Sequence, residues 1–212
     1  MTRHRYRILF AKTEAMRFTG HLDLHRSWER LLRRAGLPAS YSAGFHPHPK
    51  IQIGAALPLG ITGEGELVDI ETDAACDEAE TARLLNGHAP PGIRIVRVSA
   101  RREGSPGLEK LIVAGDYSAE SPEGAWPEDL PQRIKRMLAR DSLPRERRGK
   151  KYDLRPRILS LELKGRELQM RLSLTPEATG RPAEVLAELG MGDLPADVRR
   201  KRLILRETGG AR

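Results

Sequence analysis

Residues 17–50 read RFTGHLDLHRSWERLLRRAGLPASYSAGFHPHPK, and this stretch predicts a basic amphipathic helix followed by a stiff loop. Leu24, Trp28 and Leu31 recur at helical spacing, which predicts a helix over residues 19–35 with one face packed against a core. Four arginines lie largely outside that face, namely Arg26, Arg30, Arg33 and Arg34. The helix should therefore present a strongly positive surface to solvent.

The loop that follows, GFHPHPK at residues 44–50, combines one permissive glycine with two prolines that fix φ. This composition predicts a rigid loop that presents aromatic, imidazole and ammonium groups to a ligand. The expected pocket comprises His21, Asp23, Phe45, His46, His48 and Lys50, and Tyr152, Asp153 and Arg155 are expected to complete it across the domain interface.

Outward from this stretch, the hydrophobic pattern predicts the element order βαββαβ twice. The first series has strands at residues 6–11, 51–56, 66–71 and 92–98 and helices at residues 19–35 and 77–85. The second has strands at residues 108–117, 157–163, 167–174 and 199–205 and helices at residues 128–139 and 182–189. This order predicts an α+β fold with two tandem ferredoxin-like halves and antiparallel sheets. We expect two domains, residues 1–103 with the helix and loop described above and residues 104–212 with a basic arm.

The positive charge of the chain is concentrated in one segment. The 212 residues carry 37 Lys and Arg against 29 Asp and Glu, a net charge of +8, and residues 133–157 alone hold eleven cations and three acids. Such a concentration favours a polyanionic partner, and we expect RNA, either rRNA or tRNA. The expected phosphate contacts in this segment are Arg145, Arg147, Arg148, Lys150 and Lys151, on a flexible arm at residues 144–151. The exposed arginines of the helix, Arg26, Arg30, Arg33 and Arg34, are expected to contact phosphates as well. A solvated loop that maintains solubility is the alternative.

Several signatures of enzymes and cofactor sites are missing. The glycine-rich GITGEGE segment lacks the Gly-Lys-Ser/Thr ending of a P-loop, and the single cysteine, Cys76, allows no intrachain disulfide and no cysteine triplet for an iron–sulfur cluster. His21 and His25 stand one helical turn apart without the HExxH pattern, so we expect no metal and no cofactor. A metal-independent endoribonuclease that uses His21, His25, His46 or His48 stays open as an alternative.

The segments HLDLHRSWERLLRRAGLP and YSAGFHPHPKIQIGAALPLGI resemble the bacterial radical SAM-linked proteins, a domain family of unknown function. The resemblance is strongest over residues 5–73 and continues through KYDLRPRI at residues 151–158. It implies a partner in a modification system, because the domain occurs alone or fused behind a cobalamin-type radical SAM protein. One departure is Gly20, where the resemblance implies a serine.

Together, the charge and the resemblance predict an accessory protein that binds RNA or a ribonucleoprotein and works with a radical SAM modification enzyme. Binding rather than catalysis is the expected role. A protein-only adaptor, whose basic surface docks an acidic radical SAM partner, is the third hypothesis. The N-terminal residues lack an apolar signal core and no run approaches about 18 apolar residues, so we expect a cytoplasmic protein without a membrane span.

Overall fold

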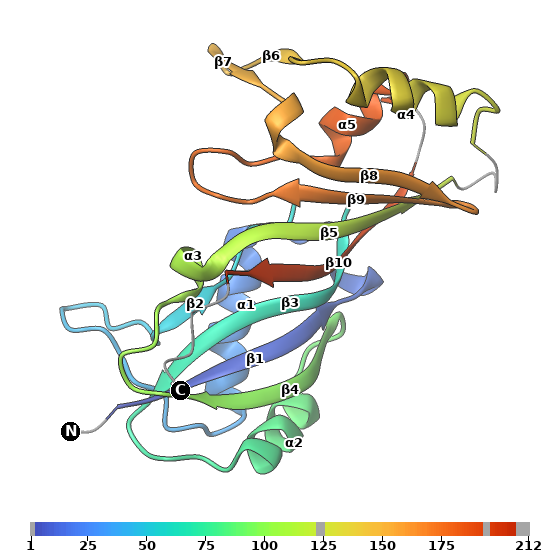
Figure 1. The fold of residues 1–212 in the computed structure, drawn as a ribbon. Helices are drawn as coiled ribbons and strands as arrows, with labels where there is room; N and C mark the ends of the chain where they lie inside the picture. Colours follow the sequence, from blue (N-terminus) through green and yellow to red (C-terminus); the bar gives the residue numbers. More distant parts are fainter. Residues whose placement is uncertain (1–2, 122–125, 193–195, 207–212) are drawn as a thin grey trace, which may run out of the picture. The chain divides into compact units, whose positions relative to one another are not determined.

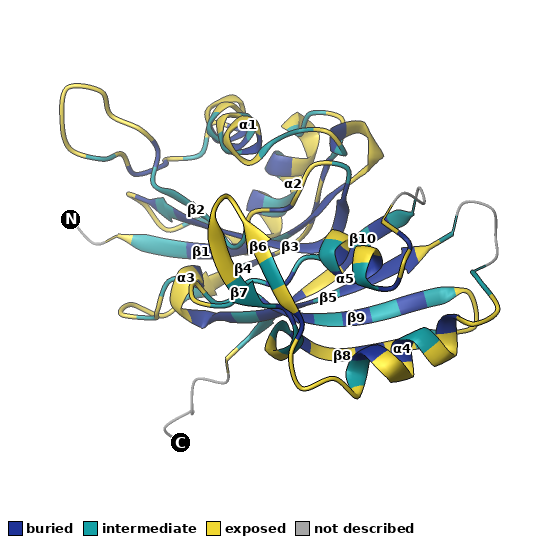
Figure 2. Ribbon diagram, turned by 90° about the horizontal axis from the view of Figure 1, so that it is seen from above, coloured by how far each residue is buried: buried dark blue, intermediate teal, exposed yellow. Residues whose placement is uncertain are grey.

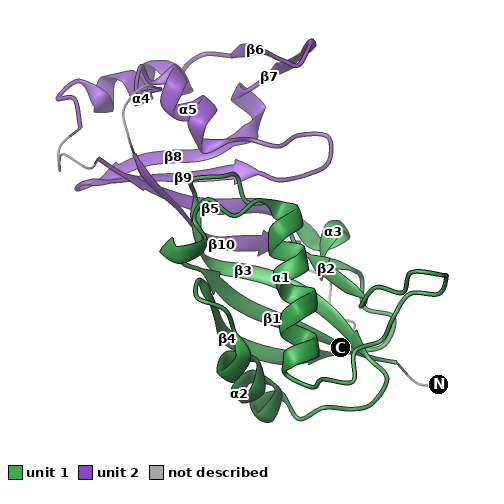
Figure 3. Cartoon of the chain, turned by 180° about the vertical axis from the view of Figure 1, so that it is seen from behind, with its two compact units in different colours: residues 1–112, 206–212 green, residues 113–205 purple. Residues whose placement is uncertain are grey.

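The computed structural model describes residues 3–121, 126–192 and 196–206 and contains two compact units (Figure 3). Unit 1 comprises residues 1–112 and 206–212, and unit 2 comprises residues 113–205. The described parts hold five α-helices and largely antiparallel β-structure (Figure 1), so the expected α+β class is confirmed. The domain boundary expected between residues 103 and 104 precedes this division and stays a prediction.

Unit 1 contains a four-stranded antiparallel sheet with the strand order β4-β1-β3-β2. Its elements are β1 (His4–Lys12), η1 (Glu14–Met16), α1 (His21–Arg34), β2 (Ile51–Ile53), β3 (Thr62–Thr72), α2 (Glu78–His88), β4 (Ile93–Arg101) and α3 (Leu108–Leu111). Helices α1 and α2 cover one face of this sheet (Figure 1). Among the described residues no helix is both long and apolar enough to cross a membrane, and the longest, α1, has 14 residues.

The core of unit 1 lies between α1 and the sheet. Leu24, Trp28 and Leu31 are buried as their spacing predicts, whereas the arginines between them are exposed. Trp28 is 0% exposed, and its ring meets Phe10 of β1 edge to face with 5.0 Å between the ring centroids. The apolar face that the sequence predicts therefore packs α1 against the sheet. Because that face is buried, the arginines of the helix are exposed to solvent.

The opposite sides of β1 and β3 carry paired charges. Arg7 and Asp69 are directly opposite in the strand register, and the guanidinium donates to both carboxylate oxygens at 2.7 and 2.8 Å. Their side chains are only 8% and 5% exposed, so this pair is buried. Glu71 pairs with Arg5 at 2.9 Å, and the hydrogen bond from Arg5 contributes to lowering the pKa of Glu71, against the effect of burial. Cross-strand ion pairs therefore replace apolar contacts on this side of the sheet.

Unit 2 contains a sheet with the strand order β10-β5-β9-β8 and a separate two-stranded hairpin. Its elements are β5 (Ile112–Glu120), α4 (Leu130–Leu138), β6 (Pro144–Arg147), β7 (Lys150–Asp153), η2 (Arg155–Arg157), β8 (Ile158–Lys164), β9 (Glu167–Ser173), α5 (Pro182–Glu188) and β10 (Asp197–Leu205). Both helices cover one face of the sheet (Figure 1) and bury apolar side chains such as Ile134 and Val185. On β9, Leu168, Met170 and Leu172 are buried and alternate with polar residues.

Three sequence predictions were wrong in local structure. The strand expected at residues 108–117 begins with helix α3, because Leu108 and Leu111 are buried at helical spacing and the Leu108 amide donates to the Gln52 side chain at 2.9 Å. The flexible arm expected at residues 144–151 is instead the paired hairpin β6–β7. The strand expected to end at residue 56 ends at Ile53.

The N-terminus of α1 has no side-chain cap, because Gly20 occupies the N-cap position. We expect Gly20→Ser to raise the free energy of unfolding by about 0.3–0.5 kcal/mol, since a serine hydroxyl there accepts a hydrogen bond from the first turn. The extended backbone of Gly20 suits serine, and an added Cβ would lie 4.0 Å from Asp23 Oδ2. Denaturant titration measures the change. Gly20→Ala adds Cβ without an acceptor, so equal stabilisation by alanine would contradict the capping explanation.

Candidate nucleic-acid interface

The hairpin β6–β7 presents the concentrated positive charge of unit 2 to solvent. Its two-residue turn places Arg148 at φ 50° and Gly149 at φ 74°, the left-handed pair typical of a type I′ turn. Arg147 and Lys150 face each other across the ribbon. The exposed cations are Arg147, Arg148, Lys150 and Lys151, and Figure 2 shows the hairpin largely in the colour of exposed residues. The chain therefore presents four cations on a defined ribbon rather than on a loose arm.

Asp153 and Arg155 hold the base of this hairpin. One carboxylate oxygen of Asp153 accepts hydrogen bonds from the backbone amides of Leu143 at 2.7 Å and Arg155 at 2.9 Å. These amide donors lower the pKa of the Asp153 carboxyl group. The Arg155 guanidinium donates to the carbonyl oxygens of Leu138 and Ile158, each at 3.2 Å. Both side chains, which were expected in a ligand pocket, thus have structural partners inside unit 2.

Arg145 and Tyr152 attach the hairpin to the helical layer. They are cross-strand neighbours, and Arg145 forms an ion pair with Glu188 of α5. The guanidinium of Arg157 lies over the Tyr152 ring, 4.1 Å from its centroid. Burial, followed by a hydrogen bond to Glu184, raises the pKa of the Tyr152 hydroxyl. Arg145 is therefore half-buried and paired, unlike the four cations farther along the ribbon.

Helix α4 and the residues just after it add arginines that the sequence interpretation counted as charge but did not assign to the interface. Arg133, Arg136 and Arg140 line a pocket of about 420 Å³ beside the end of α5. Arg133 and Arg136 lie three residues apart on one face of α4, and Arg140 follows the end of the helix at Leu138. Arg140 pairs with Glu188 at 2.9 Å, and Glu188 also binds Arg145 of the hairpin. One carboxylate therefore connects Arg140, just beyond α4, with the ribbon.

The basic face of α1 in unit 1 is only partly available. Arg26 pairs with Asp23 at 3.2 Å, and the Arg34 guanidinium donates to the His88 carbonyl oxygen at 3.0 Å. Arg30 and Arg33 are exposed and have no ion pair among the residues that the structure describes. A phosphate contact by the four arginines of α1 stays a prediction.

A glutamate that sequence reasoning missed attaches the GFHPHPK loop to α1. Glu29 Oε1 lies 3.3 Å from His48 Nδ1 and 3.5 Å from His25 Nδ1. The loop is closed by reciprocal contacts, because the Ser42 amide donates to the His48 carbonyl at 2.9 Å and the His48 amide donates to the Ser42 hydroxyl at 3.0 Å. A carboxylate one helical turn after His25 was the signal in the sequence. Glu29 therefore holds two imidazoles from segments that are distant in sequence.

The other expected pocket residues are arranged differently. Burial and repulsion from His25 lower the pKa of His21. Phe45 and His46 are exposed at the tip of the loop, and Lys50 pairs with Glu71 at 3.2 Å. Within the described ranges no three His, Cys, Asp or Glu side chains are grouped so that they could hold a metal ion. Tyr152, Asp153 and Arg155 belong to unit 2, so the pocket expected between the halves stays a prediction.

The fold and the charge distribution define a two-unit α+β protein with an exposed basic hairpin. The chain belongs to the DUF2344 family of uncharacterized proteins conserved in bacteria, whose sequence profile matches residues 5–182. The expectation of a domain of unknown function is thereby confirmed, whereas that family description contains no radical SAM association. No curated protein matches the chain. Among solved structures it is similar to the crystal structure of an unknown protein from Galdieria sulphuraria, with 12% identity over 97% of this chain and 100% of the other and a TM-score of 0.29.

Proposed function

We propose that the protein binds RNA or a ribonucleoprotein surface through the hairpin β6–β7 and works as an accessory to a radical SAM modification enzyme. The observation that carries this proposal is the set of four exposed cations around the hairpin turn, Arg147, Arg148, Lys150 and Lys151. Lys and Arg that neutralise phosphates supply most of the sequence-independent affinity for nucleic acid. An exposed two-stranded ribbon can also place these cations along a phosphate backbone.

The anchoring of the hairpin distinguishes this proposal from a charge run that only maintains solubility. A solubilising loop needs no fixed conformation, but this ribbon is held by Asp153 at its base and by the ion pair between Arg145 and Glu188. Fixing the cations before binding reduces the entropy lost when they meet phosphates. The geometry therefore favours a recognition element over a solvated arm.

The modification chemistry in this proposal belongs to a partner. This chain has one cysteine, Cys76, whereas an iron–sulfur cluster needs several thiolates. The proposed role is therefore to present rRNA or tRNA to a radical SAM enzyme in the cytoplasm. The association with that enzyme rests on the resemblance of residues 5–73 to radical SAM-linked proteins.

We further propose that both units are ferredoxin-like halves. The support is that corresponding strands have the same order, β4-β1-β3-β2 in unit 1 and β10-β5-β9-β8 in unit 2. In each unit two helices cover one face of the sheet (Figure 1). The hairpin β6–β7 is then an insertion between the first helix and second strand of the second half, which is where a functional element is tolerated.

A salt titration of RNA affinity tests the binding proposal. Four phosphate contacts predict that the logarithm of the association constant falls linearly with the logarithm of salt concentration, with a slope of about −3 for single-stranded RNA. Filter binding or fluorescence anisotropy measures this slope. A slope near zero would contradict phosphate recognition.

A metal-independent endoribonuclease is the second candidate, and the position of Glu29 favours it. A carboxylate that binds an imidazole fixes the orientation of the ring. Glu29 has this relation to His48, whose side chain is 68% exposed and thus accessible to a substrate. One histidine could then remove a proton from a ribose hydroxyl and another could protonate the leaving oxygen.

Incubation of folded RNA with the protein in chelator separates the two candidates. Binding without catalysis predicts that the RNA stays intact. If cleavage occurs, His48→Ala should reduce its rate by about 100-fold or more, and Glu29→Gln should also lower it. His88→Ala removes an exposed imidazole at the end of α2, outside the candidate site, and is the matched control. Cleavage that requires His48 but not His88 would replace the binding proposal with the nuclease.

The protein-only adaptor is tested by copurification. A radical SAM partner that stays bound after nuclease treatment, together with no affinity of the protein for RNA, would select the adaptor. Loss of the partner on nuclease treatment would instead support an association through RNA.

A further inference from the structure

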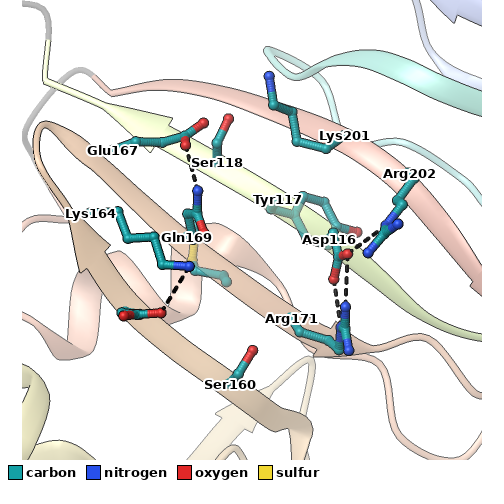
Figure 4. A pocket seen from close by; sticks show the side chains of 12 residues that line it. Asp116, Tyr117, Ser118, Ser160, Lys164, Glu167, Gln169, Arg171, Lys201 and Arg202 are labelled. Atoms are coloured by element: carbon teal, nitrogen blue, oxygen red, sulfur yellow. Dashed lines mark hydrogen bonds and ion pairs between the residues drawn. The ribbon is translucent and has the colours of Figure 1, made fainter.

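A polar pocket of about 430 Å³ opens on the sheet of unit 2 (Figure 4). It is built from two rows of side chains that cross three adjacent strands. One row holds Ser160, Arg171 and Asp116, and the row two residues farther along β9 holds Glu162, Gln169 and Ser118. Lys201 and Arg202 of β10 complete the edge of the pocket. Its volume lies in the range of small-ligand sites.

Two guanidinium groups converge on one carboxylate in this pocket. Arg171 donates from Nε to Asp116 Oδ1 at 2.6 Å and from its second nitrogen to Oδ2 at 3.0 Å. Arg202 donates from Nε to Asp116 Oδ2 at 2.8 Å. The hydrogen bond from Arg171, followed by that from Arg202, lowers the pKa of the Asp116 carboxyl group. Asp116 is therefore ionised at neutral pH and neutralises only one of two fixed positive charges.

This arrangement leaves guanidinium N–H groups of both arginines available to a further anion. No other side-chain hydrogen bond involves Arg171 or Arg202 among the residues described, so one terminal nitrogen of Arg171 and both of Arg202 keep their N–H groups. The two side chains are 42% and 64% exposed. Guanidinium groups that are held in place by a carboxylate suit phosphate, which they bind through paired N–H groups.

The other end of the pocket carries hydrogen-bonding groups without a net excess of positive charge. Figure 4 shows Gln169, Ser118 and Glu167 together at this end, away from Arg171 and Arg202. Gln169 donates to Glu167 at 2.7 Å, which leaves its carbonyl oxygen and a second N–H for a ligand. An amide group with this pair of functions matches the donor and acceptor edge of a nucleobase. Residues two apart on one strand lie roughly 6.6 Å apart, so the two ends can serve one ligand.

We propose that this pocket binds one nucleotide of an RNA strand, with Arg171 and Arg202 on its phosphate and Gln169 on the edge of its base. The assignment to RNA rests on the proposed function, whereas the recognition of a nucleotide rests on the pocket itself. Tyr117, the aromatic residue of the lining, is buried beside Arg200, so hydrogen bonds rather than base stacking select the ligand.

Titration of the full chain with nucleoside 5′-monophosphates, followed by amide chemical shifts, tests the pocket. Arg202→Ala should weaken nucleotide binding by roughly 10-fold, because a charge-assisted hydrogen bond is lost. Gln169→Ala should reduce the differences in affinity among the four bases. Arg166→Ala is the matched control, since Arg166 is an exposed arginine on the turn between β8 and β9 and does not line the pocket.

Three results would overturn the inference: no nucleotide binding by the wild-type chain, unchanged binding by Arg202→Ala, or equal affinity for inorganic phosphate. The proposed RNA-binding function can fail independently of the pocket inference, and the same experiments distinguish the two failures. If long RNA does not bind but mononucleotides shift the pocket residues, the RNA proposal fails and nucleotide recognition holds. If RNA binds through the hairpin while Arg202→Ala and Gln169→Ala change neither its affinity nor its base preference, the pocket inference alone fails.

Discussion

Replacement of the four exposed hairpin cations by serine is expected to weaken RNA binding by about 100-fold at roughly 0.15 M salt. The variant changes Arg147, Arg148, Lys150 and Lys151. Each phosphate contact releases bound counterions, so the loss of four contacts should also make the salt slope less negative by about 3. Fluorescence anisotropy with a labelled RNA hairpin across a salt series measures both quantities on the same sample.

The matched control removes the same net charge elsewhere. Arg94, Arg97, Arg102 and Lys110 are exposed in unit 1, and their replacement by serine changes the total charge equally. This control should keep most of the RNA affinity. An equal loss in both variants would mean that overall charge, rather than the hairpin, determines binding. Circular dichroism should show that both variants remain folded, because the substituted side chains are exposed.

Asp69→Ala is expected to lower the free energy of unfolding of unit 1 by about 3–5 kcal/mol. The substitution leaves the Arg7 guanidinium buried without its two charge-assisted hydrogen bonds, which are 2.7 and 2.8 Å long in the intact pair. An unpaired buried charge costs more than the pair itself contributes. Denaturant titration should therefore show a large decrease in the unfolding midpoint.

The double variant Arg7→Met/Asp69→Leu is the control, because it removes both charges and fills the space that they occupied with apolar side chains. It should recover most of the lost stability. Trp28 lies in the core of unit 1 and Trp126 lies in unit 2, so a Trp126→Phe background makes the fluorescence report unit 1 alone. A loss below about 1 kcal/mol in Asp69→Ala would show that the pair is solvated rather than buried.

The parts of the fold that were predictable have strong local periodicity. Helix α1 follows from the spacing of Leu24, Trp28 and Leu31, and strand β9 alternates buried and partly buried residues. The hairpin β6–β7 was not predictable from its apolar pattern, because its residues are almost all charged. Its turn places Arg148 at positive φ, which the sequence marks only through the following Gly149. Contacts with the rest of unit 2, rather than the intrinsic strand preference of its residues, therefore define the conformation of this hairpin.

The candidate interface was predictable in composition but not in arrangement. The excess charge of residues 133–157 places the candidate interface in one segment, whereas the contacts by which Asp153 and Arg155 support the hairpin were not predicted. Glu29 and the pocket around Asp116 depend on contacts between segments that are far apart in sequence. A single sequence does not show which carboxylate meets which cation across strands.

Ultraviolet crosslinking of the tagged protein in its native cells, followed by sequencing of the attached RNA, tests the central claim most directly. The hairpin variant without its four cations should be analysed in parallel. The wild-type protein should enrich one region of rRNA or tRNA, and the variant should lose this enrichment. RNA at background level with good recovery of the wild-type protein would contradict RNA recognition and favour the protein-only adaptor.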